Sequence, residues 1–153
     1  MEIFAAYLHF ISIMVLAGLL AAECALCNEH LQPGHVRLLA RIDAAYIAAA
    51  VLVLISGLLL LVGYERHVWA TLTQPAFWTK FGIFVALGAV AVYPSLQFQR
   101  WNRAIATGQE RILTTRDIRR TRRVILVELA LLAIVPLLAA WLARGAHPPA
   151  IRP

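Results

Sequence analysis

Charged residues are scarce in this chain, and so are the short motifs by which many enzymes are recognised. Only 14% of the 153 residues are charged and 61% are hydrophobic, whereas about a quarter of the residues in soluble domains are charged. The mean hydropathy is +0.75. The sequence has no P-loop, no H-E-x-x-H pair, no glycine-rich dinucleotide motif and no internal repeat. These absences argue against the common nucleotide-binding, zinc-protease and repeat proteins, and the composition indicates an integral membrane protein.

Cysteine is scarce as well. Cys24 and Cys27 form a single C-x-x-C, and Asn28 stands where haem attachment through this motif needs a histidine. His30 and His35 follow, so a metal site with cysteine ligands remains an alternative. Because there is no second C-x-x-C, the pair is more simply two reduced packing residues on one helical turn. The sequence leaves the role of this pair open.

Four apolar stretches are long enough to cross a bilayer as helices, namely residues 3–26, 43–64, 77–98 and 124–143. Pro94 and Pro136 lie inside the last two, where membrane helices tolerate proline. Because no Lys or Arg precedes the first stretch, we expect a permanent helix rather than a cleaved export signal. The sequence therefore predicts an all-α fold, a single transmembrane domain built as a four-helix bundle. Small residues would let these helices approach closely, namely Gly18, Ala22, Ala44, Ala48, Gly57, Gly82 and Gly88.

Arginine is distributed unevenly between the predicted connections. Ten of the fourteen Lys and Arg residues follow the first and third stretches, most of them in residues 99–123. Because short basic loops stay in the cytoplasm, we expect this basic loop to be cytoplasmic and both termini to lie outside. The net charge of +6 raises the question of nucleic acid. A basic run beside a membrane helix is better explained by topology, so we expect the lipid bilayer and anionic lipid headgroups as partners, and no nucleic acid.

Ionisable residues inside membrane spans are costly, which makes them candidates for function. His9 and Lys80 are expected near the outer end, because each lies one or two turns into a span that starts outside. Glu23, Asp43 and Glu128 are expected toward the opposite end. His9 and Glu23 also share one helix face, since the fourteen positions between them make roughly four turns. The sequence therefore predicts two polar layers inside the bundle.

The three carboxyls form the layer on the cytoplasmic side. They cannot all stay ionised in a low dielectric unless cations balance them. We therefore expect mixed pairs and shared protons, with arginines from the basic connections taking part. Such a network either holds the helices together or forms a proton path, and the sequence leaves both interpretations open. The arginines within reach are Arg41, Arg119 and Arg123.

Lys80 and His9 form the outer layer, and each has two interpretations. Lys80 is the only lysine beside thirteen arginines. A desolvated lysine can lose its proton and become a ligand, which arginine cannot do. The other interpretation is a lysine that snorkels at the interface beside Phe77 and Trp78. His9 is either an axial haem ligand or a buried histidine hydrogen-bonded to a neighbour such as Ser12 or to a backbone carbonyl.

The polar and glycine positions resemble those of a bacterial family of four-helix membrane proteins, domain of unknown function 2214. More distantly, residues 7–12 and 78–81 are similar to the first and third helices of the membrane-bound, haem-containing protoporphyrinogen oxidase of bacteria and of related copper-resistance membrane proteins. In that oxidase the equivalent His and Lys matter for haem and activity, which implies such roles for His9 and Lys80. The residues that carry the first resemblance are His9, Gly18, Glu23, Asp43, the segment 75–80, Pro94, Glu128, Pro136 and the segment 143–145.

Together these features lead to a functional hypothesis. The chain would be a multi-pass protein of the bacterial inner membrane that binds haem b near its outer face and transfers electrons or protons, and any enzymatic activity would be that of an oxidoreductase. His9 would be the axial metal ligand, with Lys80 or His67 as the second ligand. The alternatives are a small proton-coupled transporter or channel that uses the buried carboxylates, and a structural or assembly subunit. Formation of a homo-oligomer is left open.

Overall fold

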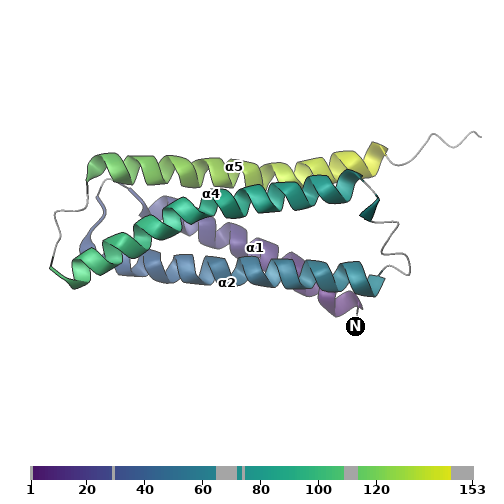
Figure 1. Ribbon diagram of the computed structural model, residues 1–153, viewed down its shortest axis with the longest axis horizontal. Helices are drawn as coiled ribbons and strands as arrows, with labels where there is room; N and C mark the ends of the chain where they lie inside the picture. Colours follow the sequence, from purple (N-terminus) through teal and green to yellow (C-terminus); the bar gives the residue numbers. More distant parts are fainter. Residues whose placement is uncertain (1, 29, 65–71, 74, 109–113, 146–153) are drawn as a thin grey trace, which may run out of the picture.

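Four long helices make up the described part of the chain. The computed structural model describes residues 2–28, 30–64, 72–73, 75–108 and 114–145. Within these ranges the helices run roughly along one axis (Figure 1). The first helix begins at one end of the bundle. At the opposite end the first helix is followed by the second, and the third by the fourth. The helices are α1 (Glu2–Leu26), α2 (Pro33–Tyr64), α4 (Pro75–Ala106) and α5 (Thr115–Gly145).

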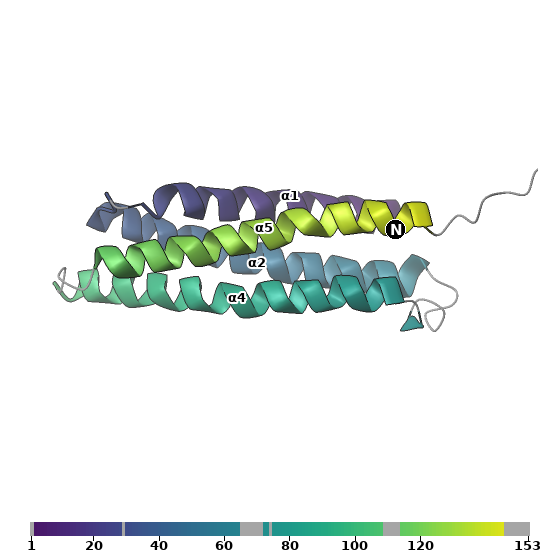
Figure 2. The ribbon, with the colours of Figure 1, turned by 90° about the horizontal axis from the view of Figure 1, so that it is seen from above.

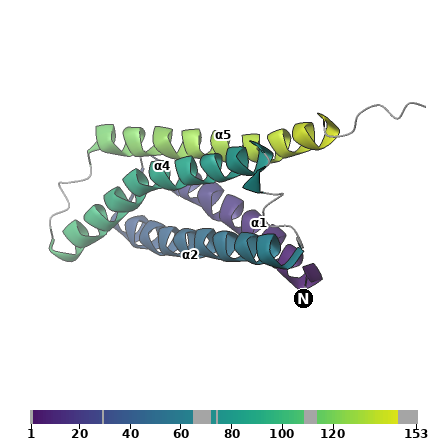
Figure 3. The same ribbon diagram turned by 45° about the vertical axis from the view of Figure 1, so that its right-hand side comes forward.

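The helices pack in a ring. Helix α1 lies mainly against α2, and α4 lies mainly against α5. The ring is closed by a smaller contact of α2 with α4 and by a still smaller contact of α1 with α5 (Figures 2 and 3). Helices α1 and α4 therefore occupy one diagonal of the bundle, and α2 and α5 occupy the other.

Three helices are long and apolar enough to cross a membrane. The qualifying segments are Ile3–Leu26, Pro33–Gly63 and Phe77–Ala106. Large apolar side chains cover the outside of the bundle, as expected where lipid rather than water is the solvent. Helix α5 contains the fourth predicted span, 124–143, but it begins with an arginine-rich third and is not among the three, which were sought only in the described residues. That span stays a prediction. Examples of the outward-facing residues are Phe10, Met14, Leu59, Val62 and Leu137.

The helices are longer than the predicted spans, and the predicted basic loop 99–123 is for the most part helical. Helix α4 continues to Ala106 and α5 begins at Thr115. The extensions are amphipathic, because Trp101 is 1% exposed while Arg100 and Arg103 face outward. Gly108, at a φ of 75°, then ends α4 in the left-handed conformation that glycine adopts at no steric cost.

The best-packed part of the bundle lies toward the end where α4 finishes and α5 begins, which we call the Arg-rich end. In α4 the buried residues start at Leu87, and in the described part of α5 they stop at Glu128. The small residues expected between the helices are therefore mostly not there: Gly18, Gly82 and Gly88 are exposed. At Gly57 an added Cβ would lie 3.3 Å from His9 Cε1, so only this one of the predicted glycines makes a close approach.

Candidate functional site

Three carboxyl side chains from three helices are buried inside the bundle. Glu23 of α1 is 2% exposed, Asp43 of α2 is 3% exposed and Glu128 of α5 is 1% exposed. Glu23 interacts electrostatically with both of the others, and so does Glu128 with Asp43. They therefore form one group, which we call the carboxyl cluster.

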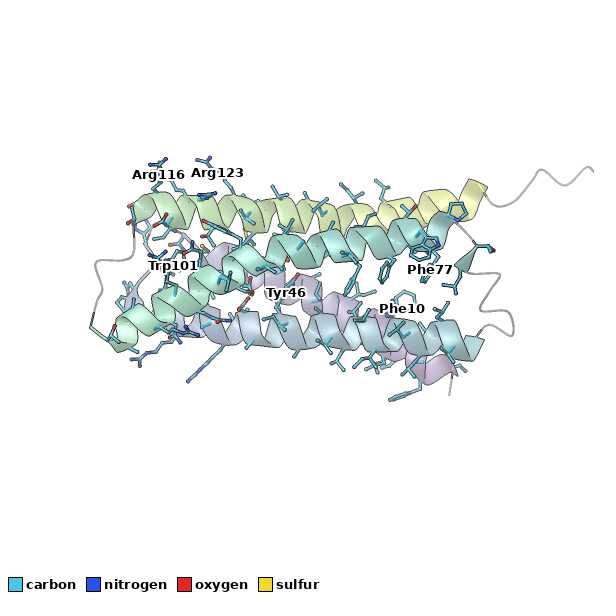
Figure 4. All side chains as sticks on the ribbon, in the orientation of Figure 1. Phe10, Tyr46, Phe77, Trp101, Arg116 and Arg123 are labelled. Atoms are coloured by element: carbon cyan, nitrogen blue, oxygen red, sulfur yellow. The ribbon has the colours of Figure 1, made fainter. Side chains whose placement is uncertain are left out.

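Hydroxyl groups provide the partners of two of the three carboxyls. The Tyr46 hydroxyl of α2 donates a hydrogen bond to Glu128 Oε1 of α5. The Ser95 hydroxyl of α4 donates one to Asp43 Oδ1 of α2. Tyr46 and Ser95 are themselves buried, and Tyr46 lies in the middle of the bundle's length (Figure 4). These contacts link α2 to its neighbour α4 and, across the interior, to the diagonal helix α5.

Sequence reasoning missed both hydroxyl residues because it considered only ionisable groups within spans. A signal existed for Tyr46, which follows Asp43 by three positions and so lies on the same helix face. Ser95 gave no comparable signal, because no acidic residue stands three or four positions from it in α4. Which hydroxyl meets which carboxyl depends on how the helices pack.

Two of the three arginines expected in the network lie outside it. Arg41 and Arg123 are exposed, and within the described part of the chain neither makes an ion pair with the cluster. The reason is helical geometry: Arg41 precedes Asp43 by two positions, which is about 200° around the helix, and Arg123 precedes Glu128 by five positions, or about 140° away. The hydrogen-bond partners of Asp43 and Glu128 are hydroxyls rather than guanidinium groups.

The cluster is therefore short of positive charge. Three ionised carboxylates in a low-dielectric interior would repel one another, and removing each from water costs several kcal/mol. Neither Arg41 nor Arg123, both exposed, offsets this cost in the described part of the chain. Protons, shared with hydroxyl groups, are the simplest charge carriers that such a site can hold. Chemically, the arrangement can bind and release protons inside an otherwise apolar bundle.

His9 lies nearer the other end of α1 and is held by α2. Its Nδ1 is 2.9 Å from Ser56 Oγ and 3.2 Å from the Val53 carbonyl oxygen. The ring is half-buried, and its Nε2 has no hydrogen-bond partner in the parts of the chain that the structure describes. The expected neighbour Ser12 is not its partner. The sequence-based alternative of a histidine bonded to a neighbouring helix residue matches this geometry.

Lys80 does not lie beside His9 in the packing order, because its helix α4 is diagonal to α1. Its side chain is exposed, next to the exposed aromatics Trp78 and Phe81. This is the geometry of a lysine that snorkels at an interface. His67, the alternative second ligand, lies outside the described residues.

The two cysteines are free thiols. Cys27 is fully buried and its Sγ lies 3.8 Å from the Ile118 carbonyl oxygen. Burial raises the pKa of the Cys27 thiol to about 12, so it stays protonated and unreactive. His30 and His35 are exposed, and no group of three His, Cys, Asp or Glu side chains in the described ranges is arranged to hold a metal ion.

The fold and the site thus define a helical membrane protein with a buried carboxyl cluster. Residues 1–146 match the family described as predicted membrane protein (DUF2214), and since this is nearly the whole chain, the protein belongs to that family. No curated protein and no solved structure matches the chain.

Proposed function

We propose that this protein carries protons through the membrane as a small proton-coupled transporter or channel, with Glu23, Asp43 and Glu128 as the proton carriers. The observation that supports the proposal is their burial in the same part of the bundle, where they interact electrostatically and where Asp43 and Glu128 have hydroxyl partners. Buried carboxyls in membrane helices are costly, so their presence on three helices indicates a function rather than simple packing.

The hydroxyl partners suit proton transfer. An O–H group can donate a hydrogen bond to an ionised carboxylate and can accept one from a protonated carboxyl. The bonds of Tyr46 to Glu128 and of Ser95 to Asp43 therefore accommodate both protonation states without a change of partner. An arginine partner would favour the ionised state alone and would oppose the uptake of a proton.

An apolar stretch separates the cluster from the polar group nearest the other end. His9 lies fourteen residues from Glu23 along α1, or about 21 Å. Between these levels the interior contains the buried side chains of Leu16, Ala49 and Val53. A proton needs water or a helix movement to cross this stretch. The proposal therefore favours gated, coupled transfer over a permanently open channel.

A flux assay in lipid vesicles tests the proposal. Purified protein is reconstituted with a pH indicator inside the vesicles, and a potassium gradient with valinomycin imposes the membrane potential. The wild-type protein should speed up the internal pH change. Glu128→Gln and Asp43→Asn should abolish most of that gain, because the amide oxygen can still accept the hydroxyl bond but cannot carry a proton.

The matched control is Asp117→Asn, which removes a carboxyl from the first turn of α5, outside the cluster. Its flux should equal that of the wild-type protein. The proposal is rejected if wild-type vesicles respond no faster than empty ones, or if the control lowers the flux as much as Glu128→Gln does.

We also propose haem b binding at His9, with a redox role, as a second candidate function. The support comes from the imidazole: a bond from Nδ1–H to the Val53 carbonyl fixes the tautomer that leaves the Nε2 lone pair free. Haem-binding histidines have this arrangement, and bound haem would supply one-electron chemistry. His9 thus fits a single axial ligand. The exposed Lys80 on the diagonal helix does not fit a second one in this arrangement.

An absorption spectrum tests this second candidate. Protein expressed with ample haem should show a Soret band, and His9→Ala should lose it. His35→Ala is the matched control, because His35 is exposed at the start of α2 and should leave the band unchanged. A colourless wild-type protein excludes haem binding. If both functions fail, the third interpretation remains, in which the buried polar groups only specify helix packing.

A further inference from the structure

Two buried polar atoms lack a hydrogen-bond partner among the described residues, and both belong to helices that line the carboxyl cluster. They are Glu23 Oε1 on α1 and Thr121 Oγ1 on α5. Glu23 is 2% exposed and Thr121 is fully buried. Buried polar atoms almost always have a hydrogen-bond partner, which is often an ordered water molecule. These two atoms are therefore exceptions that need a physical explanation.

The two atoms lie at the same level of the bundle. Cys27 directly follows α1, and its thiol contacts the carbonyl of Ile118 in α5, which fixes the register of these antiparallel helices. Moving four residues back along α1 reaches Glu23, and moving three residues forward along α5 reaches Thr121. At about 1.5 Å per residue, both steps are roughly 5 to 6 Å in the same direction. Glu23 and Thr121 are therefore neighbours in height.

Thr121 also lies on the helix face that points into the cluster. It precedes Glu128 by seven positions, which brings the helix back to within roughly 20° of the same direction. Glu128 is itself a member of the cluster and is bonded to Tyr46 inside the bundle. The Thr121 hydroxyl is thus on the interior stripe of α5.

The side-chain bond that a helical hydroxyl usually makes is missing at Thr121. Ser56, Thr79 and Thr107 each donate to the carbonyl four residues earlier in their own helix. Ser and Thr hydroxyls inside helices commonly make this bond. The Thr121 hydroxyl does not make this bond, nor does it reach Glu23, because both atoms are without a partner. The hydroxyl is available for a group that lies between the two residues.

We propose that Glu23 and Thr121 hold a buried water molecule between α1 and α5, and that this water passes protons to Glu23 from the Arg-rich end. The water would satisfy both orphaned atoms at once, by donating to Glu23 Oε1 and by accepting from the Thr121 hydroxyl. The site itself rests on burial, register and the missing helix bond. Its role in proton uptake rests on the proposed function.

The proton step is balanced without any other reactant. The bound water gives one proton to the Glu23 carboxylate, which becomes a carboxylic acid, and takes one proton from a hydronium ion on the Arg-rich side, which is left as water. The water is regenerated, and its bonds to Thr121 and Glu23 exchange roles. From Glu23 the proton can pass on to Asp43 or Glu128, the members with which Glu23 interacts electrostatically.

Infrared difference spectroscopy tests the site independently of transport. The carboxyl C=O band of Glu23 is assigned by its loss in Glu23→Gln. We expect Thr121→Val, which keeps the side-chain shape but removes the hydroxyl, to shift this band, and Thr121→Ser to restore its position. Exchange into H₂¹⁸O should shift an O–H band that is present in the wild-type and Thr121→Ser proteins and absent in Thr121→Val.

The outcomes separate the two claims. A Glu23 band that stays unchanged in Thr121→Val, or a band that shifts with no ¹⁸O-sensitive partner, overturns the water site. If the site is present, Thr121→Val should slow proton flux severalfold in vesicles and Thr121→Ser should retain it. Equal flux in all three proteins overturns the uptake role, and a wild-type protein without flux overturns the proposed function while the infrared result still decides the site.

Discussion

The hydrogen bond between Tyr46 and Glu128 offers the sharpest test of how the carboxyl cluster stabilises the bundle. Both residues are buried, at 6% and 1% exposure, and the bond joins α2 to α5 across the interior. Tyr46→Phe removes only the hydroxyl and leaves the ring in place. Any loss of stability therefore reports the bond and not the packing of the aromatic ring.

The expected magnitude follows from the burial of Glu128. A typical hydrogen bond contributes about 0.5–1.5 kcal/mol, and a buried acceptor left without its donor costs about 1–3 kcal/mol. We therefore expect Tyr46→Phe to lower the free energy of unfolding by about 2 kcal/mol, which is roughly a thirtyfold change in the unfolding equilibrium. Glu128→Gln should cost less, because the amide oxygen can still accept the bond.

The assay is equilibrium unfolding of purified protein in mixed micelles, read from helix content. Tyr7→Phe is the matched control, because Tyr7 is 64% exposed and its hydroxyl makes no hydrogen bond among the described residues. The control should change stability by less than about 0.5 kcal/mol. The double variant Tyr46→Phe/Glu128→Gln completes a cycle whose coupling energy should exceed about 0.5 kcal/mol, since the two groups are in contact.

Two results would refute this reasoning. The first is a Tyr46→Phe protein as stable as the Tyr7→Phe control, which would mean that the hydroxyl contributes nothing. The second is a strict sum of the two single effects in the double variant, which would mean that Tyr46 and Glu128 do not act on each other. Either result would also weaken the proton-carrying role given to this pair.

Three further predictions concern topology, packing and the buried thiol. In a background without other accessible cysteines, Gly108→Cys should resist an impermeant thiol reagent on intact cells while Ala70→Cys reacts, and the reverse pattern would invert the predicted orientation. Trp101→Ala should destabilise the protein by about 3–5 kcal/mol in micelles, whereas Trp78→Ala, at 56% exposure, should change stability little; equal effects would contradict the position of the core. Burial raises the pKa of the Cys27 thiol from its ordinary value of 9.0 to about 12, so the stability tied to this protonated thiol is complete below pH 9 and is lost as the pH rises from 9 to 12. Its alkylation should be much slower in the folded protein than in the unfolded chain at pH 8.5, and equal rates would show that the thiol is not buried.

Much of the fold was readable from the sequence. The apolar stretches 3–26, 43–64 and 77–98 fall inside α1, α2 and α4, because a bilayer demands helical backbone and about 20 apolar residues wherever the chain crosses it. The helix ends were placed less well. Amphipathic extensions such as the one around Trp101 are too polar for a hydropathy criterion, yet they pack as helix onto the core.

The position of each polar residue along its helix could also be read from the sequence. A helix rises by about 1.5 Å per residue, so the distance of Glu23, Asp43 and Glu128 from the ends of their spans follows from counting. The helix face of each residue follows from the same geometry. Arg41 and Asp43 are two positions apart in one helix, so their side chains point in nearly opposite directions and cannot form an ion pair. Position along one helix depends only on the spacing of residues in the sequence, because the rise and the rotation per residue are constant.

Only the tertiary structure decided which groups meet. The ring order of the helices puts α1 and α4 on a diagonal and so separates His9 from Lys80. The imidazole of His9 instead forms hydrogen bonds with Val53 and Ser56 of α2. Helix packing likewise leaves the Thr121 hydroxyl without a hydrogen-bond partner among the described residues, at the height of Glu23. These contacts depend on helix order, rotation and register, which arise from the fit of whole helix surfaces. No single span carries that information, because each apolar stretch would be equally stable in lipid with a different neighbour.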